Sequence, residues 1–148
     1  MPLPVLLCHA ALILAACCAP MVPAVAQGQS HTGHYTAEPS AVQLAAADVL
    51  LVDIRQPEEW QQTGVLPQAL LITHTGDHAR FLAELGPHLD GRPVALICRT
   101  GNRTARAAAA LAPALAVPVI DITGGMVRLM AEGTRPTAPT RARGCAVC

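Results

Sequence analysis

Apolar runs alternate with helix-like segments through the middle of this chain. Runs of Val, Leu and Ile with few polar interruptions are typical of strands buried on both faces of a parallel sheet, and they occur at 49–54, 69–73, 94–97 and 119–122. The segments between and after them predict helices at 41–47, 78–85, 104–111 and 127–131, with Ser40 and Asp77 as N-caps of the first two. This order of elements predicts an α/β sandwich built on a parallel sheet.

The first part of the chain has the composition of an export signal. An apolar segment that ends in Ala24-Val25-Ala26 predicts a signal peptide at 1–26, although no Lys or Arg precedes the apolar run. A second interpretation is a bacterial lipoprotein signal, because Cys17 follows Leu-Ala-Ala, and lipidation of Cys17 would tether the protein to a membrane. Either interpretation predicts a periplasmic or otherwise exported protein.

The remaining chain divides into three parts. Residues 27–38 are polar and glycine-containing, which predicts a flexible leader. The alternating elements predict one folded domain at 39–132. Residues 133–148 are rich in Thr, Pro and Arg and predict a flexible tail, which ends in the C-x-x-C pair Cys145 and Cys148.

Charge and composition exclude several classes of function. Ten basic residues balance ten acidic ones, so no net field attracts nucleic acid, and no nucleic-acid partner is expected. All ten basic residues are Arg, which excludes a Schiff-base or phosphate-loop lysine. With one Trp, one Tyr and one Phe, the chain also offers no stacking platform for bases.

Cys98 is the strongest candidate for chemistry. It follows the apolar strand at 94–97 and precedes an alanine-rich helix, so it lies at the carboxyl end of a strand, where α/β proteins bind ligands. Backbone N–H groups at the start of the helix, with Arg99 and Arg103 nearby, stabilise an anion. We therefore expect the pKa of a partly exposed Cys98 thiol to lie below its ordinary value of about 8.5. The resulting thiolate would be a nucleophile for anionic substrates.

The rest of the loop is expected to bind the anion. The Arg103 guanidinium either holds the substrate or pairs with a carboxylate, Asp53 or Glu59, and both roles are compatible. Arg99 points either to solvent or to substrate. Backbone N–H groups are the expected contribution of Thr100, Gly101, Asn102 and Thr104.

Motifs over about 39–131 resemble, in order and spacing, those of a single-domain rhodanese. They are Leu50-Leu51-Val52-Asp53-Ile54-Arg55, Pro57-Glu58-Glu59-Trp60, Gly64-Val65-Leu66-Pro67-Gln68-Ala69, the loop at 98–103, and Val119-Ile120-Asp121-Ile122-Thr123-Gly124-Gly125-Met126. The resemblance implies a rhodanese-like three-layer sandwich. It also implies a sulfurtransferase in which Cys98 takes sulfane sulfur from a small anion such as thiosulfate, holds it as a persulfide and passes it to a thiol or other thiophilic acceptor. No cofactor is implied.

The resemblance also assigns supporting roles and shows one departure. It implies that Asp53 and Arg55 help to hold the architecture of the site, with Glu59 as a further supporting carboxylate. The six-residue loop suits sulfur transfer, whereas phosphatases of this fold use a loop one residue longer. The family usually has His and Gly where this chain has Val65 and Gln68, so a histidine near the site is missing and substrate access is expected to differ.

Cys145 and Cys148 could form a disulfide, a redox pair or half a metal site. Further metal ligands are lacking nearby, so no metal is expected. A sharper hypothesis is that the tail folds back and resolves an oxidised or persulfidated Cys98. Two alternative functions stay open: a phosphatase or arsenate reductase of the same fold, and a non-catalytic redox-relay or anion-binding module.

Overall fold

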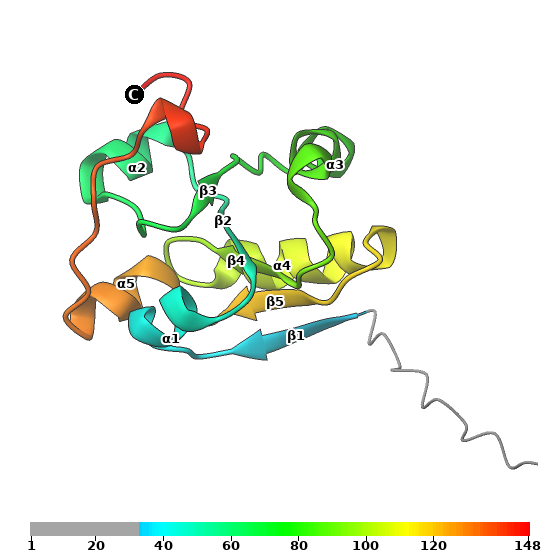
Figure 1. Ribbon diagram of the computed structural model, residues 1–148, viewed down its shortest axis with the longest axis horizontal. Helices are drawn as coiled ribbons and strands as arrows, with labels where there is room; N and C mark the ends of the chain where they lie inside the picture. Colours follow the sequence, from blue (N-terminus) through cyan, green and yellow to red (C-terminus); the bar gives the residue numbers. More distant parts are fainter. Residues whose placement is uncertain (1–32) are drawn as a thin grey trace, which may run out of the picture.

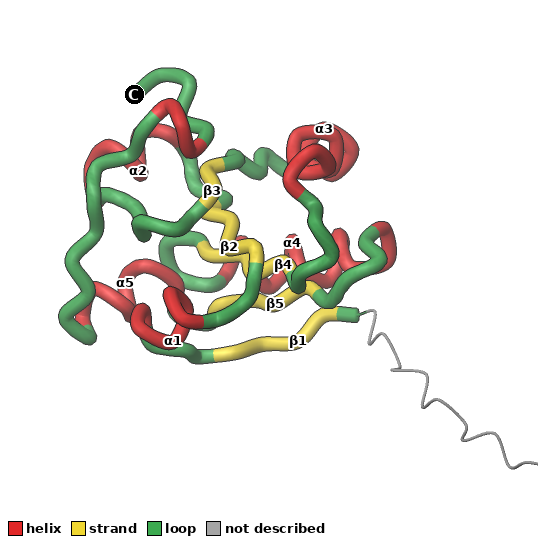
Figure 2. Tube along the Cα trace, in the orientation of Figure 1, coloured by secondary structure: helices red, strands yellow, loops and turns green. Residues whose placement is uncertain are grey.

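The computed structural model describes residues 33–148, and these form a five-stranded, all-parallel sheet. The strand order is β1-β5-β4-β2-β3 (Figures 1 and 2). The strands are β1 (His34–Ala37), β2 (Leu50–Asp53), β3 (Leu70–Leu71), β4 (Val94–Ile97) and β5 (Val119–Ile122). All four strands predicted from apolar runs are confirmed.

Strand β1 corrects the prediction of a flexible leader at 27–38. Residues 34–37 pair in parallel with β5 along one edge of the sheet, from His34 opposite Val119 to Ala37 opposite Ile122. The strand has no apolar run, because it is an edge strand with mostly exposed side chains, and Tyr35 is half exposed. Its pairing with a strand some 85 residues later gives no local signal in the sequence.

Helices cover both faces of the sheet, as a three-layer sandwich requires. One apolar cluster joins the sheet to α1 (Ala41–Ala46), α2 (Pro57–Thr63) and α5 (Gly125–Ala131). The other joins it to α3 (His78–Leu85) and α4 (Asn102–Leu111). Successive residues of β2 alternate between the two, Leu51 in the first cluster and Val52 in the second. Short 3₁₀ turns lie at Gly86–His88, Ala112–Ala114 and Arg141–Arg143.

The C-terminal segment, residues 133–148, is packed on the domain and is not the flexible tail that its composition predicts. Thr137 and Val65 exchange backbone hydrogen bonds of 2.9 and 2.8 Å. The Arg143 guanidinium donates to the carbonyl oxygens of Leu66 and Pro67, and the Cys145 side chain is fully buried. These contacts link positions about 70 residues apart, and composition does not reveal them.

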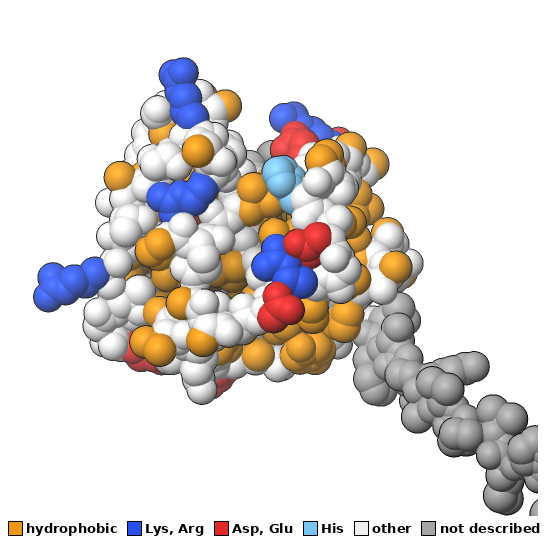
Figure 3. Space-filling model, in the orientation of Figure 1, with side chains coloured by type: hydrophobic (Ala, Val, Ile, Leu, Met, Phe, Trp, Pro, Cys, Tyr) orange, Lys and Arg blue, Asp and Glu red, His pale blue; other side chains and the backbone are white. Residues whose placement is uncertain are grey.

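The outer surface carries charge of both signs. On the face in Figure 3, basic side chains stand over the C-terminal segment, and on the right of the view acidic and basic side chains lie side by side. No helix within residues 33–148 is long and apolar enough to cross a membrane. The predicted signal peptide at 1–26 and the lipidation site at Cys17 lie outside the described residues.

Candidate active site

Cys98 is the first residue after β4, at the carboxyl edge of the sheet. Its Sγ accepts a hydrogen bond of 3.2 Å from the Gly101 backbone N–H and lies 3.7 Å from the Thr104 hydroxyl. Thr104 is buried, and its hydroxyl donates to the Gly101 carbonyl over 2.8 Å. Gly101 has a φ of +91°, a conformation that glycine adopts without steric cost and that turns the loop back over the sulfur.

The environment of Cys98 favours its thiolate. Burial is the largest single influence and opposes ionisation, but hydrogen bonds from Thr104, Thr100 and Arg103 together outweigh it. The pKa of the Cys98 thiol is therefore lowered below its ordinary value. This direction agrees with the prediction from the loop sequence.

Cys98 is more buried than we expected. The residue is 1% exposed, and its side chain belongs to the apolar cluster that includes Ile54 and Ala107. The prediction of a partly exposed thiol is wrong, because the loop at 99–101 folds over the sulfur. A reaction at Sγ therefore depends on access past the loop.

Helix α5 fixes the loop from the side. The backbone N–H groups of Met126 and Val127, in its first turn, donate to the carbonyl oxygens of Cys98 and Arg99 over 2.9 and 3.0 Å. Gly125 makes this approach possible, since a Cβ there would lie 2.8 Å from the Arg99 carbonyl oxygen. The sequence identified Gly124-Gly125 only as part of a motif of the resemblance and did not reveal that this segment holds the Cys98 loop.

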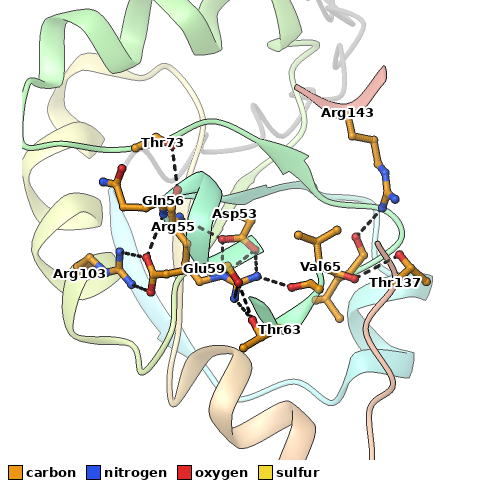
Figure 4. A network of polar contacts seen from close by, with 12 residues as sticks. Asp53, Arg55, Gln56, Glu59, Thr63, Val65, Thr73, Arg103, Thr137 and Arg143 are labelled. Atoms are coloured by element: carbon orange, nitrogen blue, oxygen red, sulfur yellow. Dashed lines mark hydrogen bonds and ion pairs between the residues drawn. The ribbon is translucent and has the colours of Figure 1, made fainter. Parts of the chain in front are cut away.

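Arg103 pairs with Glu59 and not with Asp53. Its two terminal nitrogens donate to the two carboxylate oxygens of Glu59 over 2.7 and 2.6 Å (Figure 4). These hydrogen bonds lower the pKa of Glu59, and the same carboxylate raises the pKa of Arg103. The pair joins α2 to the start of α4 and orients the guanidinium beside the Cys98 loop.

Asp53 and Arg55 form a buried ion pair behind the site. Arg55 is 1% exposed and Asp53 is fully buried, and the Arg55 Nε donates to both Asp53 oxygens over 2.9 and 3.0 Å (Figure 4). The same guanidinium donates to the Thr63 hydroxyl and the Gly64 carbonyl, over 2.7 Å each. This network ties β2 to the C-terminal end of α2, the helix that carries Glu59.

The remaining loop side chains face outward. Arg99, Thr100 and Asn102 are exposed. Arg99 lines a hollow of about 130 Å³ with Arg55 and Glu59, between α2 and α5. Arg99 therefore faces both solvent and a recess beside the loop.

A second and larger hollow, which sequence reasoning missed, lies on the other side of the loop. It measures about 380 Å³ and is lined by Arg103 together with His74, His78 and Arg106. A hollow of about 660 Å³, larger than either of these, lies between α1 and residues 132–135 and includes no residue of the Cys98 loop. The two smaller hollows are the candidate binding sites, because they lie beside the Cys98 loop.

One of the two positions that depart from the family pattern, Val65, lies under the C-terminal segment. Val65 is fully buried and pairs with Thr137, whereas Gln68 is exposed. The segment between α2 and β3 is therefore covered by residues that follow the domain in sequence.

Cys145 and Cys148 form a disulfide with each other. Cys145 is buried in the apolar cluster of α1, α2 and α5, whereas Cys98 belongs to the cluster on the opposite face of the sheet. This placement contradicts the hypothesis that the tail resolves Cys98. Within residues 33–148, no group of three or more His, Cys, Asp or Glu side chains has the arrangement of a metal site.

Comparison with known proteins identifies related domains. Residues 37–132 match the family model described as a rhodanese-like domain. The chain is similar to a rhodanese-related protein from Thermoplasma volcanium, at 26% identity and a TM-score of 0.50, over 69% of this chain and 94% of that one. It is also similar to a thiosulfate sulfurtransferase from Pseudomonas aeruginosa, at 22% identity and a TM-score of 0.55, over 74% of this chain and 21% of that one.

A protein of unknown function from Rhodopseudomonas palustris, described as a possible tyrosine phosphatase, is similar at 22% identity and a TM-score of 0.55, over 68% of this chain and 83% of that one. At 22% identity, this structure and the sulfurtransferase show a shared fold. No curated protein matches this chain.

Proposed function

The chain belongs to the rhodanese-like domain family, and we propose that it is a sulfurtransferase that carries sulfane sulfur as a persulfide on Cys98. The observation that supports this most is the position of Sγ inside the loop, where it accepts a hydrogen bond from the Gly101 N–H. Hydrogen bonds from Thr104, Thr100 and Arg103 lower the pKa of the thiol there. A thiolate held in this way is a nucleophile.

The first half-reaction loads the sulfur. The Cys98 thiolate attacks the outer sulfur of an anionic donor such as thiosulfate, a new S–S bond forms, and the donor's own S–S bond breaks. The departing sulfite takes the electron pair of that bond. Loop N–H groups and the positive charges of Arg99 and Arg103 stabilise the anions on either side of this step.

The second half-reaction transfers the sulfur from Cys98 to the acceptor. A thiol or another thiophile attacks the outer sulfur of the persulfide, and Cys98 leaves again as a thiolate. The same hydrogen bonds that lower the pKa of Cys98 make it a better leaving group. The two carboxylates near the site, Asp53 and Glu59, are already paired with Arg55 and Arg103, which supports a positioning role for them.

The decisive experiment measures thiocyanate release from thiosulfate and cyanide, together with the gain of one sulfur atom on Cys98 by mass spectrometry. Cys98→Ser should lose both signals. A Cys145→Ser/Cys148→Ser double variant is the matched control and should keep them, because Cys145 lies on the opposite face of the sheet from Cys98. Absence of persulfide on the native protein, with or without phosphate-ester hydrolysis, would refute the proposal.

We also propose that the protein is exported. The Cys145–Cys148 disulfide supports it, because disulfides persist in oxidising compartments such as the periplasm. Fractionation of cells that produce the full chain would test it, and recovery of the protein with its first 26 residues in the cytoplasmic fraction would contradict it.

A further inference from the structure

The hollow on the α3 side of the Cys98 loop has a pronounced chemical character. We call it the histidine hollow and define it by its four nitrogen-bearing side chains: His74, His78, Arg103 and Arg106. The two histidines come from the segment after β3 and the first residue of α3, and both arginines come from α4. The remaining walls are the turn Thr75-Gly76 and Ala107, so no acidic side chain lines it.

The histidine hollow lies beside the Cys98 loop. Arg103 belongs to the Cys98 loop, and Ala107, one turn further along α4, lies in the same apolar cluster as Cys98. The smaller hollow at Arg99 is instead lined by Met126, whose side chain belongs to the opposite cluster. The histidine hollow therefore lies on the face of the sheet where the Cys98 side chain packs.

The Arg103–Glu59 ion pair separates the two hollows, because Glu59 lines the smaller one and Arg103 the larger one. The small hollow is thus bordered by a carboxylate, and the histidine hollow by its guanidinium partner. The histidine hollow, which lies next to α3, therefore carries the positively charged member of the ion pair.

Two side chains of the histidine hollow, His74 and Arg106, carry polar groups that have no partner within residues 33–148. Among residues 33–148, Arg106 forms no ion pair. The Nε2 atom of His74 is buried without a hydrogen-bond partner. His74 stacks on His78 with ring centroids 5.1 Å apart and meets Phe81 edge-on at 5.2 Å, which fixes the plane of its ring. A fixed imidazole beside an unpaired guanidinium suits an anionic group that accepts hydrogen bonds.

The charged groups that face the two histidines agree with this interpretation. Burial and the neighbouring His78 lower the pKa of His74, so its imidazole is neutral at neutral pH. The nearest acidic residue in sequence, Asp77, is the N-cap of α3 and accepts from the Arg80 backbone N–H over 3.0 Å. The permanent charge of the hollow therefore comes from its arginines.

We infer that the histidine hollow binds the anionic end of the sulfur acceptor, a small thiol that carries a carboxylate. The inference rests on the proposed function and names the substrate class of its second half-reaction. About 380 Å³ lies within the range of about 300–1,000 Å³ that small-molecule sites occupy, which suits an organic thiol better than a small inorganic donor. The thiolate of the bound acceptor attacks the outer sulfur of the protonated Cys98 persulfide, the bond to Sγ breaks, and the products are an acceptor persulfide and the Cys98 thiolate.

The test compares three small thiols of similar size but different charge: mercaptoacetate, mercaptoethanol and cysteamine. Their kcat/KM values as acceptors are compared at equal thiolate concentration, with thiosulfate as the donor. In Arg106→Gln, the ratio of mercaptoacetate to mercaptoethanol should fall about tenfold or more, as expected for the loss of one charge-assisted hydrogen bond. The ratio of cysteamine to mercaptoethanol should not fall. Arg135→Gln, an arginine at the unrelated hollow beside α1, is the matched control and should change neither ratio.

The two half-reactions distinguish the acceptor from the donor. Sulfite release in a single turnover with thiosulfate reports loading alone. A loss confined to loading in Arg106→Gln, with the acceptor ratio unchanged, would overturn the inference, because the hollow would then hold the donor. An equal loss for all three thiols would overturn it as well.

A binding measurement separates this inference from the proposed function. (Methylthio)acetate, which is mercaptoacetate methylated on its sulfur, keeps the carboxylate but has no reactive thiol. Its binding can be followed through the imidazole NMR signals of His74 and His78. Arg106-dependent shifts in a protein that forms no persulfide would refute the proposed function and leave the anion site standing. Absence of shifts in the native protein, whatever its activity, would overturn the anion site.

Discussion

Replacing Gly125 by alanine would place a methyl group between α5 and the Cys98 loop. Gly125 has a φ of +56°, and its missing side chain leaves room for the backbone of residues 98 and 99. A Cβ at this position would meet the Cys98 carbonyl oxygen and would lie 2.8 Å from the carbonyl carbon and oxygen of Arg99. All of these are backbone atoms, so no flexible side chain can move aside.

The magnitude follows from two contributions. An alanine held in the left-handed region costs about 1–2 kcal/mol relative to its preferred conformation. Forcing a methyl group into a packed contact adds about 1–3 kcal/mol. Gly125→Ala should therefore lower the free energy of unfolding by about 2–5 kcal/mol, a large share of the roughly 5–15 kcal/mol that is typical of a small domain.

Gly133→Ala is the matched control for the conformational contribution. Gly133 has a φ of +93°, and a Cβ added there would meet open space, with no atom beyond its chain neighbours within 4 Å. This variant should lose only about 1–2 kcal/mol. Urea unfolding of both variants measures the difference, and persulfide formation on Cys98 should slow in Gly125→Ala alone. Equal stability losses in the two variants, or an unchanged rate in Gly125→Ala, would refute the close-packing argument.

Three further predictions concern the thiolate, the buried ion pair and the disulfide. Thr104→Val should raise the pKa of Cys98 towards its ordinary value, because it removes a hydroxyl that can turn from the Gly101 carbonyl to an ionised sulfur 3.7 Å away. Alkylation by iodoacetamide should then rise at higher pH, and Thr104→Ser should restore the native profile; an unchanged midpoint would contradict this. Arg55→Met should lower the free energy of unfolding by about 3–5 kcal/mol by leaving a buried carboxylate unpaired, whereas Arg92→Met, at an exposed pair, should change it far less; similar losses in urea unfolding would disprove the role of burial. Cys148→Ser should lower the free energy of unfolding by about 2 kcal/mol, because it opens a short disulfide ring. Dithiothreitol should destabilise the native protein but not this variant; destabilisation of both would count against this role of the disulfide.

The sequence predicted the centre of the fold because buried parallel strands leave a local signal. Strands β2, β4 and β5 lie in apolar runs, and the N-caps Ser40 and Asp77 begin α1 and α3 as expected. Each of these features depends on residues that are close together in the chain. The position of Cys98 after β4 belongs to the same class, and the lowered pKa of its thiol follows from that position.

Features that depend on distant contacts were missed. Edge strand β1 has mostly exposed side chains and acquires its identity only by pairing with β5. The C-terminal segment has the composition of a flexible tail, but Thr137 pairs with Val65, and Cys145 fills a place in the core. The burial of Cys98 was missed for the same reason, since it depends on how the loop folds over the sulfur.

The histidine hollow offers imidazoles to a site that lacks the family histidine, which Val65 replaces in this chain. The family pattern has a histidine there, and its loss removes an imidazole from the α2 side of the site. In this chain Val65 is buried under Thr137, so that side is occupied by the C-terminal segment. His74 and His78 approach the Cys98 loop instead from the α3 side, beside Arg103 and Arg106. Imidazole and positive charge thus meet on the side where the Cys98 side chain packs, and this is the side on which we place the acceptor.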